Sequence, residues 1–358
     1  STEPSPVHDL KAEYVGVTSV NLTWAANDTA SDSYTYRIDV ASGSSVNNLT
    51  SSVPEVEVTE LTPGTMYNFT VFAVAADGQT EGEGVSISLY TKPSPVHDLK
   101  AEYVGVTSVN LTWAANDTAS NSYTYRIEVV NGSSVNNLTS SVPEVEVTEL
   151  IPGTMYNFTV FAVAADGQTE GEGVSISLYT KPSPVHDLKA EYVGVASVNL
   201  TWAVNDTASD SYTYRIEVVN GSFDNNLTSS VPEVEVTELI PGTMYNFTVF
   251  AVAADGQTEG EGASMSLYTK PSPVHDLKAV YVGVTSVNLM WAANDIASGS
   301  YIYRIEVVNG LSVSNLTSSV PEVEVTELIP GTMYNFMVFA VAADGQTEGE
   351  GVSISLYT

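Results

Sequence analysis

Asparagine residues in the pattern Asn-x-Ser/Thr are the arrangement in this chain with the most definite chemistry. In a secreted protein the side-chain amide of such an Asn accepts N-linked sugar, so the pattern marks candidate glycosylation sites. A single copy is a weak signal, but this chain has fifteen. They are Asn21, Asn27, Asn48, Asn68, Asn110, Asn116, Asn131, Asn137, Asn157, Asn199, Asn205, Asn220, Asn226, Asn246 and Asn315.

The placement of these residues supports glycosylation. Asn21 and Asn68 alternate with apolar residues, so each side chain is predicted on the outer face of a strand. The two would then lie on opposite outer faces of a sandwich. The sites are copies of one another, however, and an unmodified surface rich in Asn and Thr, with good β-propensity, explains the same pattern.

The last quarter of the chain departs from this pattern in one direction. It keeps Asn315, whereas Met290, Ile296, Leu311 and Met337 each replace a Ser or Thr that completes the tripeptide elsewhere. One hypothesis is that this part presents bare protein for a contact that sugars would block. Drift after duplication is the simpler explanation.

An acidic turn offers weaker chemistry. It runs from Asp77 to Gly84 and recurs from Asp166, Asp255 and Asp344. Its oxygen atoms could hold Ca²⁺ weakly, but the spacing matches no Ca²⁺-binding loop, and an ordinary solvated hairpin explains it better. Protein recognition through such a loop is the better functional interpretation.

Histidine and glutamate do not form a catalytic pattern. His8, His97, His186 and His275 each stand alone beside an Asp, which favours a structural role over a metal site or a pH sensor. Catalysis by paired carboxylates needs a cleft, and none is indicated. The sequence therefore predicts no catalysis, no cofactor and no metal site in this segment.

The candidate residues recur because the chain is a fourfold repeat. The segment Pro-Ser-Pro-Val-His-Asp-Leu begins at Pro4, Pro93, Pro182 and Pro271, a spacing of 89 residues, and residues 4–92 differ from 93–181 at only five positions. Such similar copies are not expected to carry four different sites. They are expected to act together, through the length that they span, the spacing that they set or multivalent binding. The predicted domains, called repeats 1 to 4 below, are 1–92, 93–181, 182–270 and 271–358.

Composition limits the classes of function. The chain has 43 acidic and 11 basic residues and a net charge of −32, so nucleic acid and anionic membranes would be repelled. No Cys is present, which excludes disulfides and thiolate sites. There is neither an apolar run long enough to span a membrane nor a signal peptide, so we expect an internal segment of a longer protein.

Each repeat reads as a series of short strands. In repeat 1, residues 20–24, 34–40, 56–58, 67–73 and 85–89 alternate between apolar and polar residues, and Gly-, Pro- and Asn-rich turns separate them. No stretch shows helical spacing. Six or seven strands in about 90 residues predict a β-sandwich, and linkers containing two prolines predict four sandwiches in a rod.

Two features of each repeat carry a family resemblance. Trp24, together with the segment Leu61-Thr-Pro-Gly-Thr-Met-Tyr67 that leads into a strand ending at Ala73-Val-Ala-Ala-Asp-Gly78, resembles a fibronectin type III domain. The resemblance implies an immunoglobulin-like, all-β sandwich without disulfides. It also implies that the Trp packs the core and that the Tyr forms a tyrosine corner. These structural residues are Trp24, Tyr67, Trp113, Tyr156, Trp202, Tyr245, Trp291 and Tyr334.

The same resemblance bears on recognition. In some members the loop that corresponds to Asp77–Gly84 carries an Arg-Gly-Asp integrin motif, but here the loop has no Arg. Outward apolar side chains at Phe72, Val74 and Tyr90 are instead candidates for weak self-association, which repetition along the chain would strengthen.

A finer resemblance concerns the whole array. The Ser-Pro-Val-x-Asp-Leu start, the Asn-Asp-Thr-Ala turn and the many glycosylation tripeptides are similar to the ectodomains of receptor-type tyrosine phosphatases of the eta and beta group. This implies a glycosylated extracellular spacer, with partners among protein ligands or copies of itself. A phosphatase domain and a membrane anchor would lie in other parts of the protein. A secreted or matrix adhesion protein is the alternative, and a microbial spacer is a third, which the tripeptide density disfavours.

Overall fold

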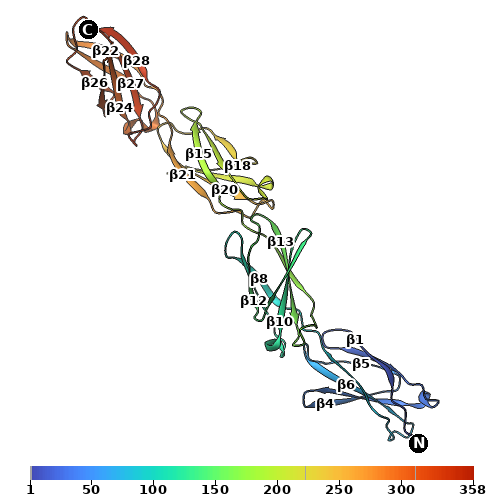
Figure 1. Cartoon of the computed structure of the whole chain (residues 1–358). Helices are drawn as coiled ribbons and strands as arrows, with labels where there is room; N and C mark the ends of the chain where they lie inside the picture. Colours follow the sequence, from blue (N-terminus) through green and yellow to red (C-terminus); the bar gives the residue numbers. More distant parts are fainter. Residues whose placement is uncertain (1, 222, 311) are drawn as a thin grey trace. The chain divides into compact units, whose positions relative to one another are not determined.

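The computed structural model describes residues 2–221, 223–310 and 312–358, and its regular structure consists of β-strands and four short 3-10 turns (Figure 1). Each repeat forms one three-stranded and one four-stranded antiparallel sheet. The predicted all-β architecture of tandem sandwiches is confirmed, and the segments without helical spacing contain no α-helix among the described residues.

By its internal contacts the chain divides into two compact halves, each with two repeats. The N-terminal half is Ser1–Leu150 with Thr154–Thr180, and the C-terminal half is Ile151–Gly153 with Lys181–Thr358.

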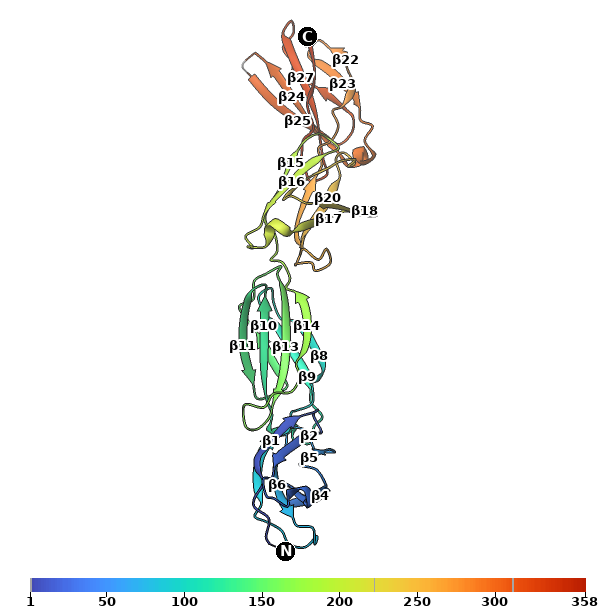
Figure 2. The same cartoon turned by 90° about the vertical axis from the view of Figure 1, so that its right-hand side faces the viewer.

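In the N-terminal half, repeat 1 has the sheet orders β1-β2-β5 and β4-β3-β6-β7, and repeat 2 has β8-β9-β12 and β11-β10-β13-β14. The sheet β11-β10-β13-β14 is seen in Figure 2. The strands of repeat 1 are β1 (His8–Tyr14), β2 (Val20–Ala25), β3 (Thr35–Ser42), β4 (Ser45–Ser51), β5 (Glu55–Val58), β6 (Met66–Val74) and β7 (Val85–Tyr90). Those of repeat 2 are β8 (His97–Tyr103), β9 (Val109–Ala114), β10 (Thr124–Asn131), β11 (Ser134–Ser140), β12 (Glu144–Val147), β13 (Met155–Val163) and β14 (Val174–Tyr179).

The C-terminal half repeats both sheet orders, with β15-β16-β19 and β18-β17-β20-β21 followed by β22-β23-β26 and β25-β24-β27-β28. Repeat 3 has β15 (His186–Tyr192), β16 (Val198–Ala203), β17 (Thr213–Asn220), β18 (Phe223–Ser229), β19 (Glu233–Val236), β20 (Met244–Val252) and β21 (Ala263–Tyr268). Repeat 4 has β22 (His275–Gly283), β23 (Ser286–Ala292), β24 (Ile302–Asn309), β25 (Ser312–Ser318), β26 (Glu322–Val325), β27 (Met333–Val341) and β28 (Val352–Tyr357).

The core of each repeat lies between its two sheets. Successive side chains of a strand point to opposite faces, so alternate residues of β2 and β6 turn inward together. Leu22, Ile38, Phe69 and Val71 are completely buried in repeat 1, and the same positions are buried in the other three cores. Burying one such side chain stabilises the fold by about 1.5–3 kcal/mol.

Two strands escaped the sequence pattern. β4 is an edge strand whose side chains are mostly exposed, so it shows no apolar alternation. β1 changes register between His8 and Lys11, where Asp9 adopts φ +55° and breaks the period of two. Both strands are recognised only through their pairing with a neighbour.

The hairpin between β3 and β4 explains one required glycine. Ser42 pairs with Ser45, which leaves a two-residue turn of Gly43 and Ser44. Gly43 has φ +58°, as the first position of a tight II′ hairpin turn requires, and glycine adopts this value without a steric cost.

We predict that residues 93–181 fold alone, because each core is closed within its own repeat. Urea titration followed by circular dichroism should show one cooperative transition. Phe158→Ala should lower its free energy of unfolding by about 3–5 kcal/mol, since Phe158 is completely buried. An unfolded spectrum for the unsubstituted segment would contradict independent folding.

Candidate functional sites on the sheet faces and at the joints

The asparagines of the glycosylation tripeptides lie on both outer faces of the sandwich. Asn21 sits on the three-stranded sheet, where it pairs with Glu13 of β1 and Glu57 of β5. Asn68 sits on the four-stranded sheet, where the Ser88 hydroxyl donates a hydrogen bond to its carbonyl oxygen over 2.8 Å. The two sites are half-buried, whereas Asn27 and Asn48 are exposed. Their occupancy by sugar remains a prediction.

An arginine stack covers the middle of the four-stranded sheet. The Arg37 guanidinium lies 4.0 Å from the centroid of the Phe72 ring. Its Nε and Nη2 donate hydrogen bonds of 2.7 and 2.9 Å to the two carboxylate oxygens of Glu81, and its Nη1 contacts Asp39. Arg126, Arg215 and Arg304 repeat the stack. No local sequence pattern reveals this stack, because Arg37 and Glu81 are far apart in the chain.

This stack orients one class of glycosylation site. In repeat 2, Arg126 donates a hydrogen bond of 2.9 Å to the carbonyl oxygen of Asn137. Arg215 and Arg304 bind Asn226 and Asn315 in the same way. Sugar is attached to the other atom of the amide, its nitrogen, so the bond and a glycan are compatible.

The proposed structural aromatic residues occupy the core. Trp24 is 6% exposed and meets Tyr36 edge to face, with ring centroids 5.1 Å apart. The backbone N–H of Thr62 donates a 2.9 Å hydrogen bond to the Tyr67 hydroxyl, which ties the turn before β6 to the strand itself. Tyr245 and Tyr334 accept equivalent bonds in repeats 3 and 4.

The acidic turn of repeat 1 and the histidines form hydrogen bonds with residues that are close to them in the chain. The Asp77 carboxylate accepts hydrogen bonds from the backbone N–H groups of Gln79 and Thr80 and from the Thr80 hydroxyl, so it closes its own turn. His8 Nδ1 lies 2.8 Å from the carboxylate of the neighbouring Asp9. This hydrogen bond is the main cause of the raised pKa of His8. In the described part of the chain, no three acidic or histidine side chains cluster as a metal site.

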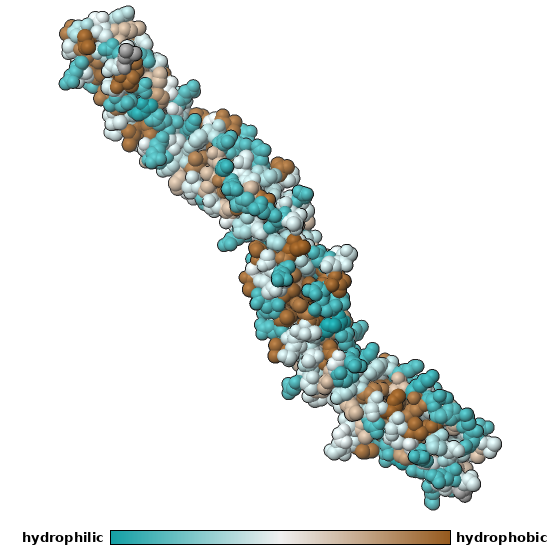
Figure 3. All heavy atoms as spheres, in the orientation of Figure 1, coloured by the Kyte–Doolittle hydropathy of each residue, from teal (hydrophilic) through white to brown (hydrophobic). Residues whose placement is uncertain are grey.

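The predicted outward apolar residues behave differently from one another. Val74 was expected to face outward but is 7% exposed, because the isolated bridge between Val74 and Glu81 folds the end of β6 under the following turn. The Arg37 guanidinium covers Phe72, and Tyr90 is half-buried. The face shown in Figure 3 has small hydrophobic patches separated by hydrophilic residues.

Repeat 4 is more apolar on its surface than the other repeats. Val280 and Met290 replace Glu13 and Thr23 of repeat 1, and they are 49% and 37% exposed. They lie on adjacent strands, in a register that makes them diagonal neighbours on the outer face of the three-stranded sheet. The loss of glycosylation tripeptides in repeat 4 is therefore accompanied by a gain of exposed apolar area.

An aspartate in the loop after the second strand holds the start of each sandwich. The Asp117 carboxylate accepts hydrogen bonds from the Ser94 backbone N–H (2.8 Å) and from the Tyr123 hydroxyl (2.6 Å). Asp28, Asp206 and Asp295 make the same pair of bonds. The aspartate of this loop thus fixes a tyrosine at the start of each repeat.

Within the N-terminal half, this tyrosine forms a joint between repeats. Gly64, at φ +62°, lies against the ring of Tyr123, and a side chain at Gly64 would overlap that ring. Burial, followed by the bond to Asp117, raises the pKa of Tyr123, whereas the pKa of Tyr34 in repeat 1 is raised mainly by its bond to Asp28. Repeat 1 therefore covers the phenol of Tyr123.

The C-terminal half contains the same joint with two further contacts. Tyr301 lies against Gly242 and donates a 3.3 Å hydrogen bond to the Pro241 carbonyl oxygen. Burial and, less strongly, the Asp344 carboxylate raise the pKa of Tyr192, whose hydroxyl also contacts Thr347. The acidic turn of repeat 4 therefore takes part in the joint and is less free to recognise other proteins than we expected.

Each repeat matches one known protein domain. The family model described as Fibronectin type III domain matches residues 5–88, 94–177, 183–266 and 272–355. The chain belongs to the fibronectin type III family. Within the described residues, no helix of this fibronectin type III chain is long and apolar enough to cross a membrane.

Curated relatives contain similar fibronectin type III arrays. Receptor-type tyrosine-protein phosphatase eta of Gallus gallus is 71% identical over 357 residues, which cover 100% of this chain and 25% of that protein. The Homo sapiens protein of the same name is 32% identical and covers 96% of this chain and 26% of that protein. Tenascin-R of Gallus gallus is 24% identical over 100% of this chain and 26% of that protein. The chain thus spans about a quarter of these relatives.

The arginine stack predicts a defined acid response. A hydrogen bond from Arg126 lowers the pKa of Glu170 below its ordinary value of 4.5. The stability contributed by this pair is therefore complete above about pH 4.5 and is lost as the pH falls through the lower folded-state pKa. In residues 93–181, urea titration should show that Glu170→Gln costs about 1 kcal/mol or less near pH 6, and that this cost shrinks as the pH falls below 4.5. If the difference in free energy of unfolding between the variant and the unsubstituted segment did not change with pH, this account would be refuted.

The joint predicts a matched pair of glycine substitutions. Gly242 and Gly256 both have positive φ, but only Gly242 faces Tyr301, and Gly256 has open space around it. Gly242→Ala should speed hydrogen exchange in the linker between repeats 3 and 4 several-fold, whereas Gly256→Ala should not. Mass spectrometry can follow a peptide that contains Met265 and Val280, which identify this linker. Equal rates of hydrogen exchange in this peptide for both variants would show that Gly242 does not stabilise the contact between repeats 3 and 4.

Proposed function

We propose that this chain is a glycosylated segment of the extracellular part of a receptor-type tyrosine phosphatase, and that it acts as a spacer and a contact region. The observation that carries this proposal is the 71% identity with the eta phosphatase of Gallus gallus over the whole of this chain. The chain itself consists of fibronectin type III repeats. Phosphatase activity would belong to a cytoplasmic domain in another part of the protein.

The spacer role follows from how the repeats are joined. A repeat that contacts its neighbour through a buried tyrosine and a glycine has less freedom than one on a flexible linker, and two prolines in each linker restrict it further. We propose that the segments 1–92, 93–181, 182–270 and 271–358 act as successive spacing modules. Their partners would be extracellular protein ligands or other copies of the receptor.

Glycosylation at the fifteen asparagines supports the same role. Sites on both outer faces would keep neighbouring molecules apart over repeats 1 to 3. Repeat 4 keeps only Asn315 and exposes Val280 and Met290, so it is the repeat best suited to direct protein contact. When many molecules lie side by side, their weak contacts would act together and give stable adhesion.

A matrix adhesion protein remains the second candidate, because Tenascin-R resembles this chain over its full length at lower identity. Sequencing the coding region beyond Thr358 separates the two candidates. We expect a membrane-spanning segment followed by a phosphatase domain. Extracellular modules and a stop codon without a membrane anchor would exclude the receptor proposal.

The glycosylation pattern makes a further testable prediction. After secretion from a eukaryotic cell, glycopeptide mass spectrometry should find sugar at several asparagines in each of repeats 1 to 3 and, in repeat 4, at Asn315 alone. The reason is that the oligosaccharide is transferred only to an Asn that is followed two residues later by Ser or Thr. The same chain made in bacteria serves as the unmodified control. Unmodified asparagines throughout would remove the glycan part of the proposal.

A further inference from the structure

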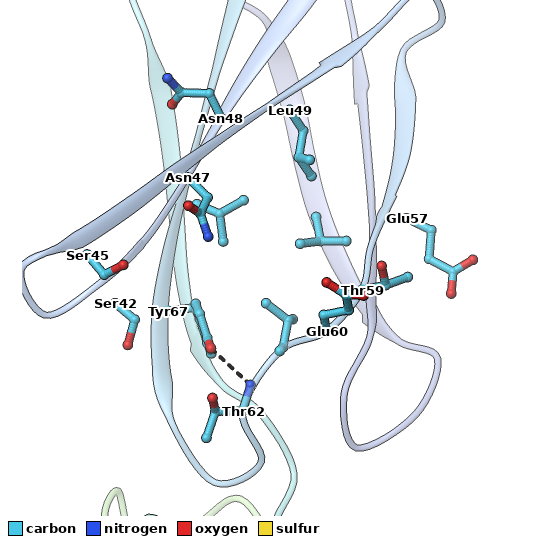
Figure 4. A pocket seen from close by; sticks show the side chains of 13 residues that line it. Ser42, Ser45, Asn47, Asn48, Leu49, Glu57, Thr59, Glu60, Thr62 and Tyr67 are labelled. Atoms are coloured by element: carbon cyan, nitrogen blue, oxygen red, sulfur yellow. Dashed lines mark hydrogen bonds between the residues drawn. The ribbon is translucent and has the colours of Figure 1, made fainter.

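A groove runs along one side of the sandwich in repeats 1 and 4. In repeat 1 it has a volume of about 590 Å³ and lies between the edge strands β4 and β5. Figure 4 shows Asn47 pointing into it from β4, Glu60 on the opposite wall and Tyr67 at its base. In repeat 4 the equivalent groove has a volume of about 400 Å³ and is lined at equivalent positions.

The groove offers hydrogen-bonding groups in an arrangement that suits an extended chain. β4 and β5 are each the last strand of a sheet, so the outer edge of each has no neighbouring strand. Asn47 lines the groove and is exposed, and its amide could bind both an N–H and a C=O group of a peptide. Addition of an extended segment to such an edge is a recurring mode of peptide recognition.

The charge of the groove identifies the partner. Glu60 lines it in repeat 1 and Glu327 lines it in repeat 4, while no Lys or Arg is among the residues lining either groove. A second copy of this chain, with a net charge of −32, would be repelled. A segment with basic side chains would be attracted.

The four repeats differ in whether a glycosylation tripeptide is complete at the wall of this groove. The wall position at the end of the third strand is Ser42 in repeat 1 and Asn309 in repeat 4, where Leu311 interrupts the tripeptide. Repeats 2 and 3 have complete tripeptides there, at Asn131 and Asn220. Sugar at those two residues would cover the groove. Asn48 is among the residues that line the groove of repeat 1, but its side chain points away from the groove (Figure 4), and Asn315 is not among the residues that line the groove of repeat 4.

We propose that the grooves of repeats 1 and 4 bind extended, basic peptide segments of a partner protein, and that glycans at Asn131 and Asn220 cover the equivalent side of repeats 2 and 3. The first and last repeats therefore have open binding sites and the two middle repeats have closed ones, although their folds are the same. The closing of repeats 2 and 3 depends on the glycosylation proposed above. The binding itself depends only on the groove.

The probe is a fluorescent peptide of alternating Lys and Thr, about ten residues long, which can run the length of β4 at about 3.3 Å per residue. Fluorescence anisotropy at low salt measures its binding to the full four-repeat chain, and a Glu-Thr peptide is the control. We expect two peptides per glycosylated chain and four per unglycosylated chain. No binding of the Lys-Thr peptide to the unglycosylated chain would refute the proposal.

Matched substitutions assign the stoichiometry to the groove. Ser42→Asn together with Leu311→Ser completes the tripeptide in repeats 1 and 4, so the glycosylated double variant should bind no peptide. Asn131→Ser together with Asn220→Ser should raise the number bound by the glycosylated chain to four. Unchanged stoichiometry in variants whose glycopeptide maps show the intended change would overturn the assignment to the groove. Bare Asn131 and Asn220 would instead show that the glycosylation proposal fails there.

A charge control separates groove binding from general attraction, and it uses the unglycosylated chain. The first variant changes the groove glutamate of every repeat to Gln, at Glu60, Glu149, Glu238 and Glu327. The second makes the same change in net charge outside the groove, at Glu83, Glu172, Glu261 and Glu350. The first should weaken binding roughly two- to five-fold and the second should leave it unchanged. Equal weakening by both sets would mean that the peptide binds by general charge alone, and the proposal would be abandoned.

Discussion

Alternation of side chains along each strand is the constraint on which this structure depends. Because neighbouring residues face opposite sides, a strand that contributes Phe69 and Val71 to the core must place Asn68 and Thr70 on the surface. Core and outer face are thus specified by the same short segment. The polar positions are free to hold glycosylation tripeptides without any loss of buried apolar area, so repeats 1 to 3 combine a well-filled core with many candidate sugar sites.

The ends of the sandwich are used differently from its sides. The head loop carries an aspartate and a tyrosine that are tied together, and the tail turn carries a glycine against which the next tyrosine rests. These contacts occupy loops that would otherwise be natural places to recognise ligands. The remaining surfaces are the two outer faces and the side where β4 and β5 leave their edges open. In repeats 1 and 4 no tripeptide is complete at the wall position of Ser42 and Asn309, so in these two repeats the open side is the best place for a protein partner.

Much of this architecture follows from residue patterns that lie close together in the sequence. The five alternating segments of repeat 1 locate strands, and Pro63-Gly64 and Asp77-Gly78 locate turns, because both signals are local. β4 gave no signal because an edge strand need not alternate. Val74 was misplaced because the turn that covers it depends on a bridge to Glu81. The arginine stack, the joint and the groove join residues that are distant in the chain, so no local pattern could reveal them.

The joint has a consequence for the gene. Each repeat carries both parts of the contact, a tyrosine at its head and a glycine at its tail, so any repeat can follow any other. Unequal recombination between the nearly identical coding segments would add or remove whole repeats in frame, and every new boundary would still pair a tyrosine with a glycine. The number of repeats can therefore vary between alleles or species while each joint stays intact, and the length of the array can evolve faster than the sequence of its modules.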